Sequence, residues 1–170
     1  MRFNTFLSSS VSLLMVGVAL SGCTKYNSFE GYAYDCECGE LTWGDRALNM
    51  RMAEAEVISE DSTVWRYHVV ADLRRPPEIE NRDEPRDIIM TIQATITGDS
   101  THHVFAAGDE AFTLQEVDSP GYAISWAMEG AELSISTSSD AHTLVLHALS
   151  ANRSGNVVDA QGVFTFDLED

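Results

Sequence analysis

Apolar and polar residues alternate along much of the chain, so that every second side chain is hydrophobic. The clearest case is residues 88–96, where isoleucine, methionine and alanine at even positions alternate with residues that include threonine and glutamine. Similar rows occupy residues 65–73, 122–128, 144–148 and 164–168. A period of two is the repeat of a β-strand that buries one face. The pattern therefore predicts strands in these ranges.

Two further segments complete the predicted sheet. Residues 45–56 (DRALNMRMAEAE) contain good helix formers, but Met50 and Met52 alternate with polar neighbours, and residues 59–62 favour a turn into the next strand. We therefore expect a strand here, and a weaker one near Phe112. Glu129-Gly130 reads as a tight hairpin. About eight antiparallel strands separated by polar turns predict an all-β fold, a β-sandwich first and a small β-barrel as the alternative.

The amino terminus reads as an export signal. Arg2 precedes an uncharged stretch that ends in the apolar run of residues 11–20, which is too short to span a bilayer. Leu20-Ser21-Gly22-Cys23 follows and resembles the lipobox of bacterial lipoproteins. That resemblance implies cleavage before Cys23 and attachment of lipid to its sulfur. The expected organisation is a lipoprotein signal peptide at 1–22, a lipidated tether at 23–35 and a single β domain at 36–170.

The resemblance also implies a location. Thr24, the residue after the lipidated cysteine, is not the aspartate that retains lipoproteins of two-membrane bacteria in the inner membrane. We therefore expect a protein of the cell envelope that is anchored by lipid in the outer membrane. Two or more acyl chains hold a protein stably, whereas one chain gives marginal binding.

The chain is strongly acidic. It has 10 basic and 27 acidic residues, and removal of residues 1–22 takes away only Arg2, so the formal net charge changes from −17 to −18. Such a field repels phosphates, which disfavours nucleic acid as a partner. The membrane, through the N-terminal lipid, and another envelope protein are the expected partners.

Cys36 and Cys38 are the two cysteines that remain after lipidation of Cys23. In an oxidising compartment a local disulfide between them is the first expectation, with Gly39 providing the bend that it needs. Three alternatives stay open: a redox-active pair, free or intermolecularly paired thiols, and metal ligands completed by His102 and His103. The acidic neighbours of the cysteines disfavour a thiolate, and their spacing matches no recognised zinc pattern.

The longest gap between predicted strands is residues 74–87, RRPPEIENRDEPRD. It holds Arg74, Arg75, Arg82 and Arg86 among five acidic residues. Long loops in compact domains are frequently functional, and the planar guanidinium suits carboxylate and protein recognition. We therefore predict that this loop contacts an envelope partner.

Evidence for enzyme chemistry is thin. Ser139, Asp140 and His142 lie close in sequence, but catalytic triads assemble across a fold, and no phosphate-binding, zinc-protease or calcium motif occurs. We expect no catalytic residue, no cofactor and no metal. The Gly-x-Trp pattern of bacterial lipocalins is not matched, because Trp43 is followed by Gly44 and not preceded by such a glycine. The leading hypothesis is a non-enzymatic binding or structural domain, and the alternative is a lipocalin-like carrier or an enzyme with an internal pocket.

Overall fold

The computed structural model describes residues 36–73, 86–119 and 122–168. These residues form nine β-strands and no helix. The strands are β1 (Gly39–Trp43), β2 (Arg46–Val57), β3 (Val64–Asp72), β4 (Asp87–Thr95), β5 (Ser100–Ala106), β6 (Phe112–Ser119), β7 (Tyr122–Thr137), β8 (Ala141–Arg153) and β9 (Asn156–Asp167).

Eight of the strands close into a barrel. They follow one another in the order β7-β6-β4-β3-β2-β1-β9-β8, and β8 pairs again with β7. Every pairing is antiparallel, and β5 is an extra strand that lies along β7. The all-β, antiparallel prediction is confirmed, and of the two predicted architectures the structure has the small barrel instead of the sandwich.

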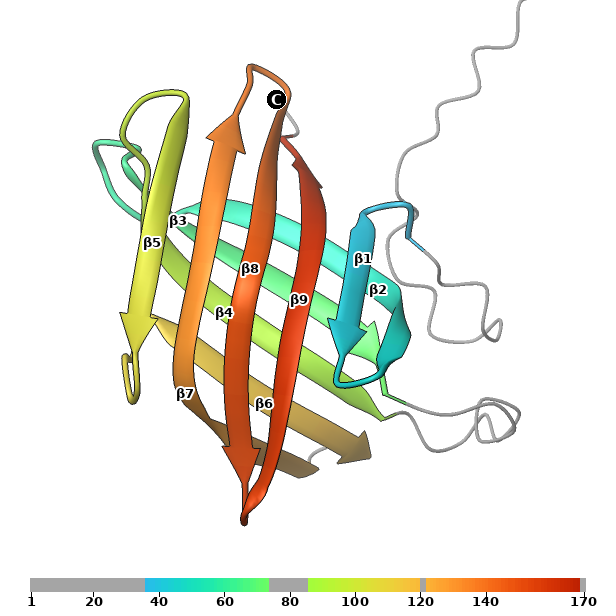
Figure 1. The fold of residues 1–170 in the computed structure, drawn as a ribbon. Helices are drawn as coiled ribbons and strands as arrows, with labels where there is room; N and C mark the ends of the chain where they lie inside the picture. The colour runs from blue at the N-terminus through green and yellow to red at the C-terminus, as the bar shows by residue number, and fades with distance from the viewer. Residues whose placement is uncertain (1–35, 74–85, 120–121, 169–170) are drawn as a thin grey trace, which may run out of the picture.

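The barrel is flattened into two layers that cross at a steep angle. Figure 1 shows β5, β7, β8, β9 and β1 in a front layer and β3, β4 and β6 running diagonally behind them. Two long strands, β2 and β7, pair with members of both layers. Each has a register shift where it passes from one layer to the other, between Met50 and Met52 in β2 and between Met128 and Gly130 in β7. Bulges bend strands at the corners of orthogonally packed sheets, which explains how the layers join.

The inward side chains of both layers fill the barrel. Tyr67, Phe164 and Phe166 are fully buried, and the rings of Tyr67 and Phe166 meet with their centroids 4.9 Å apart. Further along the interior, Trp43 and Trp126 pack edge to face at 5.2 Å. The remaining fully buried side chains are mostly aliphatic and come from both layers, among them Leu41, Ile88, Met90, Ile92, Leu114, Leu133, Ile135, Leu144 and Leu146. The alternating rows seen in the sequence are therefore this core.

Three local predictions meet different outcomes. The ambiguous segment at 45–56 is a strand, β2, as expected. The hairpin expected at Glu129-Gly130 is absent, because β7 continues through this position with a bulge. His102 and His103, named above as possible metal ligands, lie in β5, a strand that was not predicted because the alternation of Phe105 with exposed neighbours is too short to stand out in the sequence.

Candidate functional site

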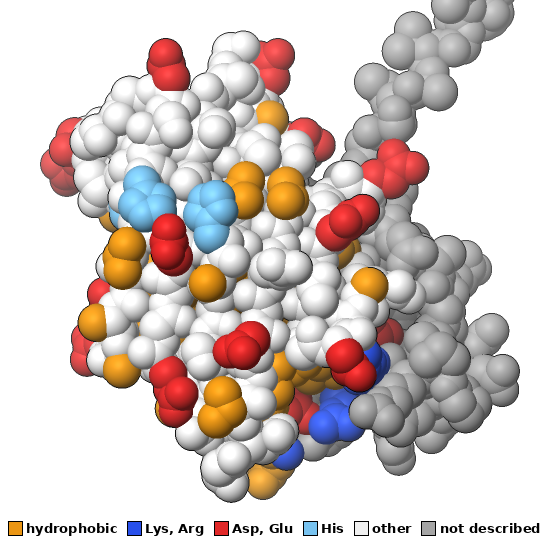
Figure 2. Space-filling model, in the orientation of Figure 1, with side chains coloured by type: hydrophobic (Ala, Val, Ile, Leu, Met, Phe, Trp, Pro, Cys, Tyr) orange, Lys and Arg blue, Asp and Glu red, His pale blue; other side chains and the backbone are white. Residues whose placement is uncertain are grey.

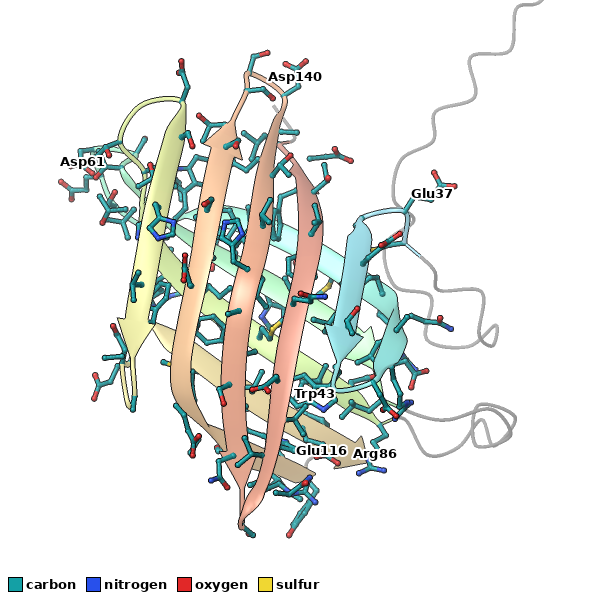
Figure 3. The ribbon with its side chains drawn as sticks, in the orientation of Figure 1. Glu37, Trp43, Asp61, Arg86, Glu116 and Asp140 are labelled. Carbon is teal, nitrogen blue, oxygen red and sulfur yellow. A yellow bond between two sulfur atoms is a disulfide. The ribbon has the colours of Figure 1, made fainter. Side chains whose placement is uncertain are left out.

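Arginine side chains gather at one end of the barrel. Arg46 is the first residue of β2, Arg86 precedes β4, and Arg153 is the last residue of β8. Together with Glu116 and Trp126 they form the group that we call the arginine mouth. Figure 3 shows Arg86, Glu116 and Trp43 at this end and Asp140 at the opposite end.

Glu116 is the centre of the arginine mouth. It follows Phe112 and Leu114 in the inward row of β6, and its side chain is only 1% exposed. Arg86 Nε donates to Glu116 Oε1 at 2.8 Å, while Trp126 Nε1 donates to Glu116 Oε2 at 3.1 Å. Arg153 Nη1 also donates to Oε2. A buried carboxylate needs such partners, because burial without them costs several kilocalories per mole.

The surroundings of Glu116 keep it ionised. Burial on its own raises the pKa of the carboxyl group. Burial is the largest single influence, but the hydrogen bond and charge of Arg86, the hydrogen bond from Trp126 and the charge of Arg153 together outweigh it, so the net pKa lies below the ordinary value of 4.5. The site therefore holds one fixed negative charge between two guanidinium groups.

Trp126 connects this ion cluster to the core. Its ring packs edge to face with the ring of Trp43 from β1, and the guanidinium carbon of Arg153 lies 5.4 Å from the Trp126 ring centroid. A guanidinium over an indole face gains cation–π attraction. Residues from β1, β6, β7 and β8 are thereby fixed to one another at the mouth.

A hollow opens beside this cluster. It has a volume of about 460 Å³, and its lining includes Trp43, Arg46, Arg86, Glu116 and Trp126. Asn156 and Val158 from the start of β9 form another part of its wall. The hollow thus combines aromatic surface with charged groups of both signs.

A second ion-pair group borders the mouth. Arg51 lies between two carboxylates, with Nη2 3.0 Å from Asp72 Oδ2 and Nε 3.0 Å from Asp87 Oδ1. Arg46 Nη2 donates to the carbonyl oxygen of Leu73 at 2.9 Å. Five arginines belong to the described residues, and all of them except Arg66 are at this end. In a chain with a net charge of −17, this end is where basic groups are concentrated, and Figure 2 shows blue side chains at the lower right.

Leu73 and Arg86, which flank residues 74–85 of the predicted partner-binding loop, meet at the mouth. The amide of Leu73 donates to the carbonyl oxygen of Arg86 at 2.7 Å, so the two ends of the 74–85 segment are held together here. Of the four arginines singled out in the sequence, only Arg86 is among the described residues. Arg74, Arg75 and Arg82 lie outside them.

The cysteine pair lies where the barrel closes between β1 and β9. Cys36 and Cys38 are joined through their sulfur atoms, with Cα atoms 5.0 Å apart. The amide of Cys36 donates to Met50 in β2, and the carbonyl of Cys38 accepts from Thr165 in β9. The positions of the residues disfavour the metal alternative. Strands β7, β8 and β9 lie between β5, which carries His102 and His103, and β1, which follows the cysteines. At the usual spacing of strands, β5 and β1 are roughly 19 Å apart.

The local Ser-Asp-His group is not assembled for catalysis. His142 is buried, and its Nδ1 lies 2.8 Å from the hydroxyl of Tyr67. Asp140 is in the turn at the far end of the barrel, and no hydrogen bond joins Ser139, Asp140 and His142 in the described part of the chain. Burial lowers the pKa of His142, as expected for a neutral core histidine.

Glu116 is the main residue that sequence reasoning missed. The chain has 27 acidic residues, so composition alone does not distinguish Glu116 from the others. Its signal was its position, because it continues the inward row of Phe112 and Leu114 two residues further on. A carboxylate in an apolar row requires a buried partner.

No helix within residues 36–73, 86–119 and 122–168 is long and apolar enough to cross a membrane. No protein-family model, curated protein or solved structure matches this chain.

Proposed function

We propose that this chain is a lipoprotein of the cell envelope, anchored in the outer membrane through Cys23, whose barrel is a non-enzymatic binding domain. In this proposal the domain contacts another envelope protein through the arginine mouth and the adjoining loop. The anchor rests on the lipobox-like Leu20-Ser21-Gly22-Cys23. The binding role rests on the side chains that surround the hollow at the arginine mouth of the barrel.

The observation that carries the binding role is the combination of side chains around the hollow. Arg46 and Arg86 meet Trp43 and Trp126 around a space of about 460 Å³. Tryptophan and arginine are the residue types most enriched among those that dominate the energy of protein–protein interfaces. The ion cluster around Glu116 holds Arg86 and Trp126 in place before a partner arrives, which reduces the entropy cost of binding.

The segment that follows Leu73 in the sequence is the second part of the proposed contact surface. Residues 74–85 start and finish where Leu73 meets Arg86, so Arg74 and Arg75 follow directly after a residue that lines the hollow. The proposed contact surface is therefore the mouth together with this segment, and a partner that presents carboxylates suits it best.

The alternative is a lipocalin-like carrier or a pocket-bearing enzyme. A carrier needs interior space, but Tyr67, Phe164 and Phe166 are fully buried within the barrel, and the rings of Tyr67 and Phe166 are in contact. The one sequence-local group that suggested an enzyme, Ser139-Asp140-His142, is not assembled. Both observations favour binding at the surface over binding or chemistry inside.

Site-specific photo-crosslinking in living cells tests the proposal. A photoreactive residue in place of Asn156, which lines the hollow, should crosslink to one envelope protein, and the same residue in place of Asp140 at the opposite end should not. The substitution Arg86→Ala should abolish the product, whereas Arg66→Ala, which removes an arginine paired with Glu56 away from the mouth, should not. Identical products from both ends, or a product that survives Arg86→Ala, would count against the proposal.

A further inference from the structure

The outer surface of the front layer carries a compact polar cluster that the proposed function does not use. His102 comes from β5, Glu132 and Ser134 from β7, and His147 from β8. Register explains the grouping: His102 pairs with Ser134, and Glu132 is two residues from Ser134 and so points to the same face. His147 lies in the bulge of β8 between Leu146 and Leu149 and is exposed. Figure 2 shows histidine side chains (pale blue) beside one another on this face, with acidic side chains (red) next to them.

Short distances join the four side chains. Ser134 Oγ lies 3.3 Å from His102 Nδ1 and 2.8 Å from His147 Nε2. The other ring nitrogen of His102, Nε2, lies 3.5 Å from Glu132 Oε1. The two imidazole centroids are 6.2 Å apart. One hydroxyl thus sits between two imidazoles, one of which also faces a carboxylate.

The spacing between His102 and Glu132 fits two ligands of one metal ion. Zinc binds histidine nitrogen at about 2.0 to 2.1 Å and carboxylate oxygen at about 2.0 to 2.2 Å, so two ligands at a tetrahedral angle lie roughly 3.4 Å apart. The observed separation is 3.5 Å. When Nδ1–H of His102 donates a hydrogen bond to Ser134 Oγ, the lone pair on Nε2 faces the carboxylate of Glu132, and the two electron-rich atoms repel each other. A cation bound between Nε2 and the carboxylate oxygen removes this repulsion. A hydrogen bond that fixes the tautomer of a ligating histidine is the usual outer-shell arrangement at metal sites.

The cluster is open to solvent and lies in an acidic protein. The side chains of His102 and Glu132 are 53% and 51% exposed. Glu132 and His147 line a hollow of about 480 Å³ on this face. The net charge of −17 raises the local concentration of cations. A metal ion can therefore reach the site without opening the barrel.

We propose that His102, Glu132 and His147 bind a divalent transition-metal ion of the zinc class, with water completing its coordination. As the side chains stand, no three His, Cys, Asp or Glu residues of the described chain surround one metal position. His147 Nε2 instead faces Ser134. Binding therefore includes rotation of His147 from Ser134 to the ion, while Ser134 keeps its bond to His102. This site is independent of the arginine mouth.

The same geometry could suggest a nucleophilic serine, and the strand pairing argues against that reading. Ser134 lies in the middle of β7, paired with His102 of β5 on one side and with Val145 of β8 on the other. Its neighbouring backbone amides are used by the sheet, so they cannot stabilise an oxyanion as an acyl-transfer site requires.

Calorimetric titration of the full-length chain with zinc chloride tests the site. We expect binding of one equivalent to this cluster, weakened at least ~10-fold by His102→Ala, His147→Ala or Glu132→Gln. His68→Gln is the matched control, because His68 is bonded to Thr91 on β4 in the other layer, and this variant should bind as the parent does. Ser134→Ala removes the outer-shell hydrogen bond to His102 and should weaken binding while the stoichiometry stays at one equivalent.

Cobalt absorption and circular dichroism complete the test. Cobalt bound by nitrogen and oxygen has weak visible bands without the intense sulfur charge-transfer band, which separates this site from any binding at cysteine. Circular dichroism confirms that each variant is folded. Zinc binding that is unchanged in a His102→Ala/His147→Ala variant, or absent in the folded parent, would overturn the proposal. Ester hydrolysis that requires Ser134 and persists in chelator would overturn it as well.

Discussion

Arg86 donates a hydrogen bond of 2.8 Å from its Nε to Oε1 of Glu116, joining the residue before β4 to a carboxylate inside β6. Arg153 and Trp126 bind the other oxygen of the same carboxylate. The end of the barrel is therefore held by one buried charge with three donors. The geometry of the arginine mouth depends on this arrangement.

The substitution Glu116→Gln should destabilise the fold more than loss of an exposed ion pair does. It removes the carboxylate charge that Arg86 and Arg153 share, and because these two side chains are partly exposed (45% and 32%) we expect a loss of about 2 kcal/mol. Urea unfolding measures this. Glu56→Gln is the control: its pair with Arg66 is solvent-exposed and should cost less than ~1 kcal/mol. Equal losses in the two variants would contradict the structural role of Glu116.

The contribution of Glu116 should depend on pH. Its folded-state pKa lies below the ordinary value of 4.5, so the unfolded chain takes up a proton first as the pH falls. The stability from its ionised form is complete above the unfolded-state pKa and is lost as the pH falls through the folded-state pKa. The difference in unfolding free energy between the parent and Glu116→Gln should therefore be constant near neutrality and shrink below about pH 4.5. A difference that grows on acidification would refute this linkage.

Gly39 should not tolerate a side chain. Its φ is +141°, and a Cβ atom there would lie 2.1 Å from the carbonyl oxygen of Val163 in β9. We expect Gly39→Ala to cost at least ~2 kcal/mol, because the β1–β9 pairing must move apart. Gly155→Ala is the matched control. Gly155 also has a positive φ, +87°, but its Cβ would meet no atom within 4 Å.

Thermal or urea unfolding of both glycine variants separates the steric effect from the backbone effect. Gly155→Ala should lose only about 1 kcal/mol, from backbone strain. Similar losses in the two variants would show that the close approach of β1 to β9 is not what requires glycine at residue 39.

The cysteine pair should matter little for stability. Cys36 and Cys38 close a loop of about three residues, for which chain entropy predicts a gain of no more than ~1.6 kcal/mol. A Cys36→Ala/Cys38→Ala variant should therefore fold and unfold with a small shift in midpoint. Mass spectrometry of protein isolated without reductant should find the two thiols oxidised to one another. Free thiols in both positions would remove the disulfide prediction.

Much of the sheet could be predicted from alternation, and its closure could not. Rows such as Ile88, Met90 and Ile92 identify strands that bury one face, and such rows are the same in a sandwich and a barrel. The two architectures differ at the corners, where the register shifts at Met50/Met52 and Met128/Gly130 bend β2 and β7. A bulge leaves no strong trace in composition, so Gly130 looked like a hairpin when it marks a bend.

The candidate site was only partly predictable. The run of arginines pointed to residues 74–87, and Arg86 does belong to the mouth. Glu116, its partner, lies 30 residues after Arg86, and Arg153, the second partner of Glu116, lies 37 residues further on. Only the order of the strands brings these three residues together. The cluster of His102 and His147 has the same cause, because both strands flank β7. To predict which side chains lie close together across a sheet, one must know which strands are neighbours.

Attachment of lipid to Cys23 is the central proposal, because it would tie the acidic barrel to a membrane of the cell envelope. Labelling of growing cells with radioactive palmitate, followed by fractionation, tests it most directly. We predict that the parent chain incorporates label and is recovered with the outer membrane, and that Cys23→Ser is unlabelled and leaves that fraction. Absence of label from the parent, or a Cys23→Ser variant that is labelled and fractionates as the parent does, would contradict the account.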